Sequence, residues 1–183
     1  MSSSLVLGAI AAVVALGAIF TRTYLRLRGT RVVTCPDNQQ PAAVDLAASQ
    51  ATLGALLGGQ SFRLDACSRW PEKLGCGQEC LAQVHASPES CLVRRIAGDW
   101  YQGQDCALCR KPFGEIHWHD RRPALRTAAG ETLQWTEIAA EKLPATLREC
   151  LPVCWSCHVA ESFRREHSDL VVERPPRPRP DHA

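Results

Sequence analysis

The pattern of hydrophobic and polar residues separates an apolar start from the rest of the chain. Residues 1–21 carry no charged side chain, and residues 5–20 are apolar throughout. A helix of about 20 residues covers the hydrocarbon thickness of a bilayer. A cleaved signal peptide would have basic residues before the apolar run, and none are present. The pattern therefore predicts a transmembrane helix over residues 1–21.

A basic segment, residues 22–34, follows the apolar run. It carries four cationic side chains and no acidic one: Arg22, Arg26, Arg28 and Arg31. Arginines beside a membrane helix are typical of its cytoplasmic side. We therefore expect a single-pass protein of the inner or plasma membrane, with the N-terminus outside and the C-terminal domain in the cytoplasm. The arginines are expected to lie against anionic lipid head groups.

The rest of the chain shows both the two-residue alternation of strands and the 3.6-residue period of helices, which predicts an α+β fold. Alternation and short apolar runs predict strands over 31–33, 42–46 and 61–67, and a β-hairpin formed by 115–119 and 131–136. Helical spacing and capping residues predict helices over 47–57, 78–85, 88–99 and 157–167.

The chain contains ten cysteines, which we expect to remain reduced in the cytoplasm and to act as ligands or redox groups. Four of them form two CxxC pairs: Cys106, Cys109, Cys154 and Cys157. A tight turn can direct two thiolates at one ion, and the first turn of a helix can direct two more. Four thiolates in tetrahedral arrangement are a ligand set that zinc prefers. The spacing therefore predicts a metal site at these four residues.

The order of a turn with CxxC, a hairpin and a CxxC that opens a helix resembles the treble-clef class of zinc fingers. The resemblance covers Cys106 to about His167. It implies one zinc ion held by all four cysteines, with no open coordination position and hence a structural role. More loosely, the chain is similar to membrane-anchored bacterial proteins, a likeness that implies no activity.

A second cysteine group lies nearer the N-terminus, at Cys67, Cys76, Cys80 and Cys91. These four thiols could hold a second metal, either zinc or an iron–sulfur cluster. Alternatively, some of them are small buried hydrophobic residues, which free cysteine often is. Cys35 has no obvious partner in the sequence.

The run from Cys154 to His158 also reads as CxxCH, the attachment motif for c-type haem. An electron-transfer or redox protein with haem c, or with an iron–sulfur cluster, is therefore the main alternative. The expected cytoplasmic location argues against haem, and so does Cys106–Cys109, which haem would leave unexplained. Without haem, His158 is expected either in the outer shell of the metal site or facing solvent.

The treble-clef framework also hosts HNH nucleases, in which His117 or His119 would take the place of the general base. The chain lacks a counterpart of that motif's asparagine, because Asn38 is its only one. A net charge of +2 is also a poor electrostatic design for DNA, so we expect no nucleic-acid partner. We assign no catalytic residue and favour a protein that is not an enzyme.

These predictions divide the chain into five segments. They are a transmembrane helix (1–21), a basic juxtamembrane segment (22–34), a cysteine-rich module (35–103), a treble-clef-like zinc-binding module (104–170) and a disordered tail rich in Pro and Arg (171–183). The expected role is binding or scaffolding at the membrane, with a protein partner that the sequence does not identify.

Overall fold

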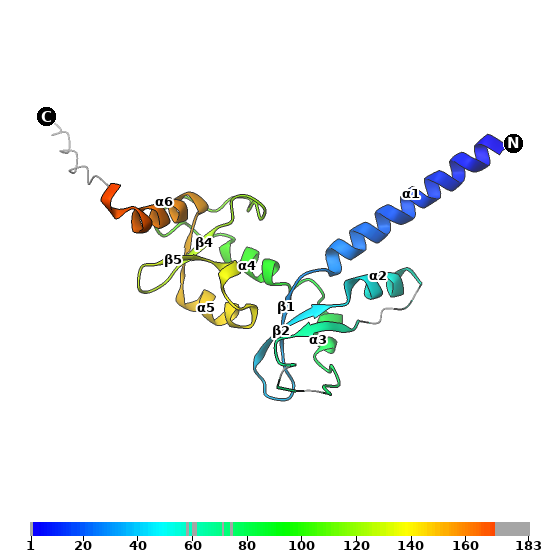
Figure 1. Ribbon diagram of the computed structural model, residues 1–183, viewed down its shortest axis with the longest axis horizontal. Helices are drawn as coiled ribbons and strands as arrows, with labels where there is room; N and C mark the ends of the chain where they lie inside the picture. The colour runs from blue at the N-terminus through cyan, green and yellow to red at the C-terminus, as the bar shows by residue number, and fades with distance from the viewer. Residues whose placement is uncertain (1, 58, 60–61, 71, 74, 171–183) are drawn as a thin grey trace. The chain divides into compact units, whose positions relative to one another are not determined.

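The computed structural model describes residues 2–57, 59, 62–70, 72–73 and 75–170 (Figure 1). The chain mixes helices and strands and begins with an apolar helix. It divides into two compact units: residues up to Tyr101 together with Thr136–Arg148, and Gln102–Trp135 together with the residues from Glu149 on. The expected Pro- and Arg-rich tail, 171–183, lies outside the described residues.

Helix α1, Ser2–Leu27, is the apolar helix that the sequence predicts. Its stretch Val6–Leu27 is long and apolar enough to cross a membrane by length and composition. The helix continues past residue 21 because the first residue that disfavours it is Gly29, which has a φ of +113°. At its C-terminal end, Leu27 is buried against α2, Ala48–Leu56.

The first unit is built on a three-stranded antiparallel sheet in the order β1 (Arg31–Thr34), β2 (Pro41–Leu46), β3 (Leu64–Cys67). Alternate residues of β2 are buried, as the sequence pattern predicts: Ala42, Val44 and Leu46. Helix α3, Leu81–Ala86, contributes the fully buried Val84 to the same core. Strand β3 is shorter than predicted and begins at Leu64.

Arg31 is fully buried in this unit, which corrects the expectation that it faces lipid. Its guanidinium donates hydrogen bonds to the carbonyl oxygens of Leu27 at 2.7 Å, Gly29 at 2.9 Å and Pro88 at 3.1 Å. Burial lowers the pKa of Arg31, and the nearby Cys91 opposes that shift. The side chain thus joins the end of α1 to the loop before helix α4 (Val93–Tyr101) and satisfies carbonyl groups that would otherwise lack partners.

Helix α4, Val93–Tyr101, begins later than the sequence predicts. Leu92 forms an antiparallel bridge with Arg31, and the N–H of Val93 donates to Thr30 O at 3.0 Å. This extended pairing with β1 delays the helix because residues in a bridge cannot adopt helical backbone angles.

Residues 136–148 belong to the first unit, although the sequence pattern predicts them within the zinc-binding module. They include most of the 3₁₀ helix η1 (Trp135–Glu137), all of η2 (Ala140–Lys142) and most of α5 (Leu143–Glu149). Helix η2 contacts β1 and β2, and α5 buries Leu143 and Leu147.

The second unit holds a three-stranded antiparallel sheet in the order β5 (Thr132–Gln134), β4 (Ala124–Arg126), β6 (Leu151–Val153), followed by α6, Trp155–Glu166, and η3, Ser168–Leu170. The prediction of a strand over 115–119 is wrong, because this segment is irregular and ends in a turn. Ala124 and Leu125, both fully buried, form the central strand in its place.

Replacing Arg31 with lysine should destabilise the first unit by about 2–3 kcal/mol. A single ammonium cannot reach the carbonyl groups that the planar guanidinium spans, so buried acceptors lose their partners. Hydrogen exchange of the β1–β2 amides in detergent micelles measures this local free energy. Arg94→Lys, at an exposed position, is the matched control and should change it by less than about 0.5 kcal/mol. Equal protection in both variants would contradict the structural role of Arg31.

Candidate metal centre

The first CxxC pair lies in a tight turn of the second unit. The N–H of Cys106 donates to Lys111 O at 2.9 Å, and the N–H of Arg110 donates to Cys106 O at 2.9 Å. Arg110 adopts a φ of +59°, which lets the chain reverse directly after Cys109. An antiparallel bridge between Asp105 and Pro112 closes the turn. Both thiols are therefore presented on one side of a short hairpin-like loop.

The second pair lies at the start of α6. Cys154 is the residue before the first helical one and retains extended backbone angles, and Cys157 lies within the first turn. Strand β6 delivers the chain to this point, and its Pro152 O accepts a hydrogen bond from the N–H of Ala107 at 2.8 Å. This bond holds the turn of the first pair against the strand that leads into the second.

The four sulfur atoms of Cys106, Cys109, Cys154 and Cys157 all lie within 4.8 Å of one another. Cys109 Sγ and Cys154 Sγ are 3.8 Å apart. A tetrahedral zinc–thiolate centre has Zn–S bonds of about 2.3 Å, which places its sulfurs about 3.8 Å apart. The four cysteines that the sequence singles out are thus brought together at a spacing that fits one metal ion.

Backbone amides direct hydrogen bonds at this cluster. The N–H of Cys154 donates to Cys106 Sγ at 3.3 Å. Although burial raises the pKa of Cys106, N–H donors from Cys109, Cys154 and Leu108 lower it to about 6. Burial and hydrogen bonds with the neighbouring sulfurs raise the pKa of Cys157 well above its ordinary value. Without an ion the site therefore favours the thiolate at Cys106 and the neutral thiol at Cys157, and four thiolates require a cation among them.

His158 is buried beside the cluster and does not face solvent. Its Nδ1 lies 3.0 Å from the hydroxyl oxygen of Thr132 on β5. This contact joins α6 to the sheet and fixes the orientation of the helix that carries Cys154 and Cys157. This placement agrees with the expected position of His158 outside the ligand set, where residues that support metal ligands commonly lie.

His117 and His119, the histidines of the nuclease comparison, are both exposed. They lie on the irregular segment 115–119, where Trp118 between them is half-buried and packs edge-on against Trp135 with ring centroids 5.5 Å apart. The sequence predicts a hairpin that carries these histidines, and the hairpin that forms consists of β4 and β5 instead.

The cysteines of the first unit are grouped differently from the sequence-based set. Cys67, Cys76 and Cys80 line one small cavity together with Cys35. Cys91 lies instead at Arg31, and its thiol donates to the carbonyl oxygens of Ser87 and Pro88. The part of the chain that the structure describes contains one group of cysteines with all sulfurs within 4.8 Å, the C-terminal one.

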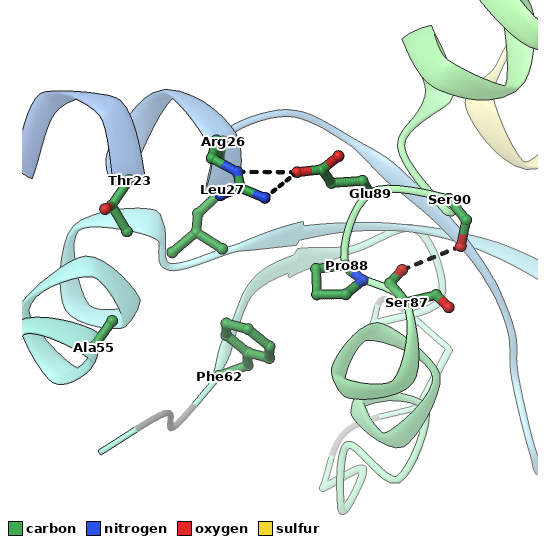
Figure 2. A pocket seen from close by; sticks show the side chains of 9 residues that line it. All are labelled: Thr23, Arg26, Leu27, Ala55, Phe62, Ser87, Pro88, Glu89 and Ser90. Carbon is green, nitrogen blue, oxygen red and sulfur yellow. Dashed lines mark hydrogen bonds and ion pairs between the residues drawn. The ribbon is translucent and has the colours of Figure 1, made fainter. Parts of the chain in front are cut away.

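A larger hollow of about 410 Å³ lies at the end of α1 (Figure 2). Figure 2 shows Arg26 from α1 directed at Glu89, to which its Nε donates at 2.9 Å. These two side chains are the charged groups among the described residues that line the hollow, and they neutralise each other. We assign no ligand to this hollow.

No protein-family model, curated protein or solved structure matches this chain. The role of the cysteine cluster is therefore inferred from its own geometry.

Cys109→Ser should unfold the second unit, whereas His119→Ala should leave its stability unchanged within about 0.5 kcal/mol. Loss of one ligand weakens a centre of a type that contributes an apparent ~10–16 kcal/mol of binding energy to folding. That energy exceeds the usual stability of a small domain. Circular dichroism and protease resistance of the full chain in micelles measure the effect. A protease-resistant second unit in Cys109→Ser would contradict a metal-dependent fold.

Proposed function

We propose that the second unit is a treble-clef-type zinc module whose one zinc ion is structural and whose role is binding at a membrane. The observation that carries the proposal is the convergence of four sulfur atoms within 4.8 Å. The order of the unit supports it: a turn with one CxxC pair, the β4–β5 hairpin, and α6 opened by the other pair. With all four positions occupied by protein, the ion has no place for a substrate or a reactive water.

The spacing of the sulfurs favours a single ion over c-type haem. Haem attachment would convert Cys154 and Cys157 to thioethers bonded to a porphyrin. Cys106 and Cys109 lie within 4.8 Å of the same sulfurs, which leaves no room for the ring between the two pairs. An iron–sulfur cluster would hold the thiolates on separate irons, and hence farther apart. Among iron centres, only a single iron ion would fit the same four sulfurs as zinc.

Helix α1 supports membrane anchoring, with the remaining chain in the cytoplasm. Arg22, Arg26 and Arg28 lie exposed at its C-terminal end, the arrangement that favours the cytoplasmic side. A reducing compartment agrees with ten cysteines that form no disulfide among the described residues.

An exposed apolar stripe on α6 supports the binding role. Trp155, Val159 and Phe163 recur at every fourth residue and therefore share one face of the helix. Their side chains are 37%, 43% and 49% exposed. A contiguous apolar surface is a common mark of a protein–protein contact, so the partner is expected to present an apolar surface to this face.

The intact protein, purified from cytoplasmic membranes under reducing conditions, should be colourless and contain zinc. Elemental analysis with visible spectroscopy measures both properties. Iron with strong visible absorbance would contradict the zinc proposal. A Soret band that persists after denaturation would also contradict the cytoplasmic location, because haem is attached to CxxCH outside the cytoplasm.

A photo-crosslinker placed at Val159 should give one discrete adduct in native membranes, and Phe163→Glu should abolish it. A charge at position 163 places an unpaired carboxylate in the apolar contact. The matched control is the same crosslinker at Arg164, whose side chain pairs with Glu161 next to the stripe. Equal adducts at positions 159 and 164, or an adduct that survives Phe163→Glu, would contradict binding through this face.

A further inference from the structure

Four cysteines of the first unit surround a single small cavity. Cys35, Cys67, Cys76 and Cys80 line it, and its volume of about 20 Å³ matches one water-sized species. Cys80 is buried, with 6% of its surface exposed. Its thiol lies within electrostatic range of the other three cysteines. The four come from three places in the sequence: the turn after β1, the end of β3 and the loop before α3.

Hydrogen bonds with glutamine side chains hold these three segments together. Thr34, the residue before Cys35, donates its N–H to Gln83 Oε1 of α3 at 2.9 Å and accepts from Gln83 Nε2 at 2.6 Å. Gln78, between Cys76 and Cys80, accepts at its Oε1 from the N–H of Leu64 on β3 at 3.0 Å. The cavity is therefore a built feature, because polar side chains on α3 and its preceding loop are fixed against the strands that carry the other cysteines.

Positive charge faces the same cavity. Arg69 and Lys73 line it, and each also pairs with a carboxylate, Arg69 with Glu72 and Lys73 with Asp37. The Nε of Arg69 is buried and has no hydrogen-bond partner among the described residues. A zinc ion with four thiolates carries a net charge of −2. The two cationic groups at the cavity partly offset it, because their carboxylate partners, Glu72 and Asp37, are the more exposed members of the two pairs. An unpaired N–H beside such a centre would find an acceptor in a thiolate sulfur.

We infer that Cys35, Cys67, Cys76 and Cys80 form a second zinc-binding site, independent of the C-terminal centre. Four neutral thiols bind the ion with release of their four protons. The four sulfurs do not all lie within 4.8 Å of one another, as those of the C-terminal centre do, so ligation requires a change of rotamer about the Cα–Cβ bonds. This set includes Cys35, to which the sequence alone gives no partner, and excludes Cys91, which lies at Arg31.

Zinc content per chain tests the site. The full-length protein in micelles, purified under reducing conditions with zinc in the medium, should contain two zinc ions. Cys35→Ser should contain one, and the matched control Cys91→Ser should retain two. Cys109→Ser should also contain one, because it removes the other centre, and the Cys35→Ser, Cys109→Ser double variant should contain none. These variants separate failure of this site from failure of the C-terminal one.

Two further measurements distinguish ligation from a general loss of folding. Cys35→His should retain both metals, because imidazole can replace a thiolate. In the cobalt-substituted protein it should weaken the thiolate-to-metal absorption. In the unmutated protein, Cys35 should resist alkylation until a chelator is added.

Three outcomes would overturn the inference. The first is one zinc ion in the unmutated protein that Cys35→Ser retains. The second is loss of one zinc ion in Cys91→Ser but not in Cys35→Ser. The third is a Cys35 that becomes reactive only after a disulfide reductant is added.

Discussion

The electrostatics of four closely spaced sulfur atoms constrain the second unit more than any other feature. Two unit charges about 4 Å apart repel by about 4 kcal/mol at an effective dielectric constant of about 20. Four thiolates within 4.8 Å of one another therefore require a cation at their centre. The strands of this unit, each of three residues, bury too little apolar surface to hold them against that repulsion. The proposed ion thus supplies the attraction that brings the turn, the sheet and α6 together.

The sequence predicted this cluster because its information is local. A CxxC pair places two thiols on one side of a turn whatever surrounds it. Only the distance between the two pairs depends on the tertiary structure. The strand over 115–119 failed for the opposite reason. Trp118 alternates with exposed histidines as a strand would require. The central strand of the sheet, however, is formed by Ala124 and Leu125. Their burial depends on contacts with residues distant in the sequence.

The first unit shows the same limit at Arg31 and at Cys35. A cationic residue after an apolar helix is normally solvated, and no sequence pattern indicates the carbonyl groups that enclose Arg31. Cys91 was grouped with Cys67, Cys76 and Cys80 by proximity along the chain. The antiparallel sheet instead brings the turn after β1 to the end of β3, so Cys35 joins them. Grouping of ligands by sequence separation fails wherever a sheet joins distant segments.

The path of the chain determines how strongly the two units depend on each other. Residues 136–148 pack within the first unit, yet both of their neighbouring segments belong to the second. Unfolding of the second unit would turn 102–135 into a flexible loop that tethers 136–148 to β1 and β2. Closing a flexible loop of that length costs about 3 kcal/mol or more, since the cost scales as (3/2)RT ln n. That cost is comparable to the burial of Leu143 and Leu147, each worth about 2 kcal/mol. The residues that line the cysteine cavity all lie between 33 and 80, outside this exchange, so we expect the cavity to persist when the C-terminal centre is empty.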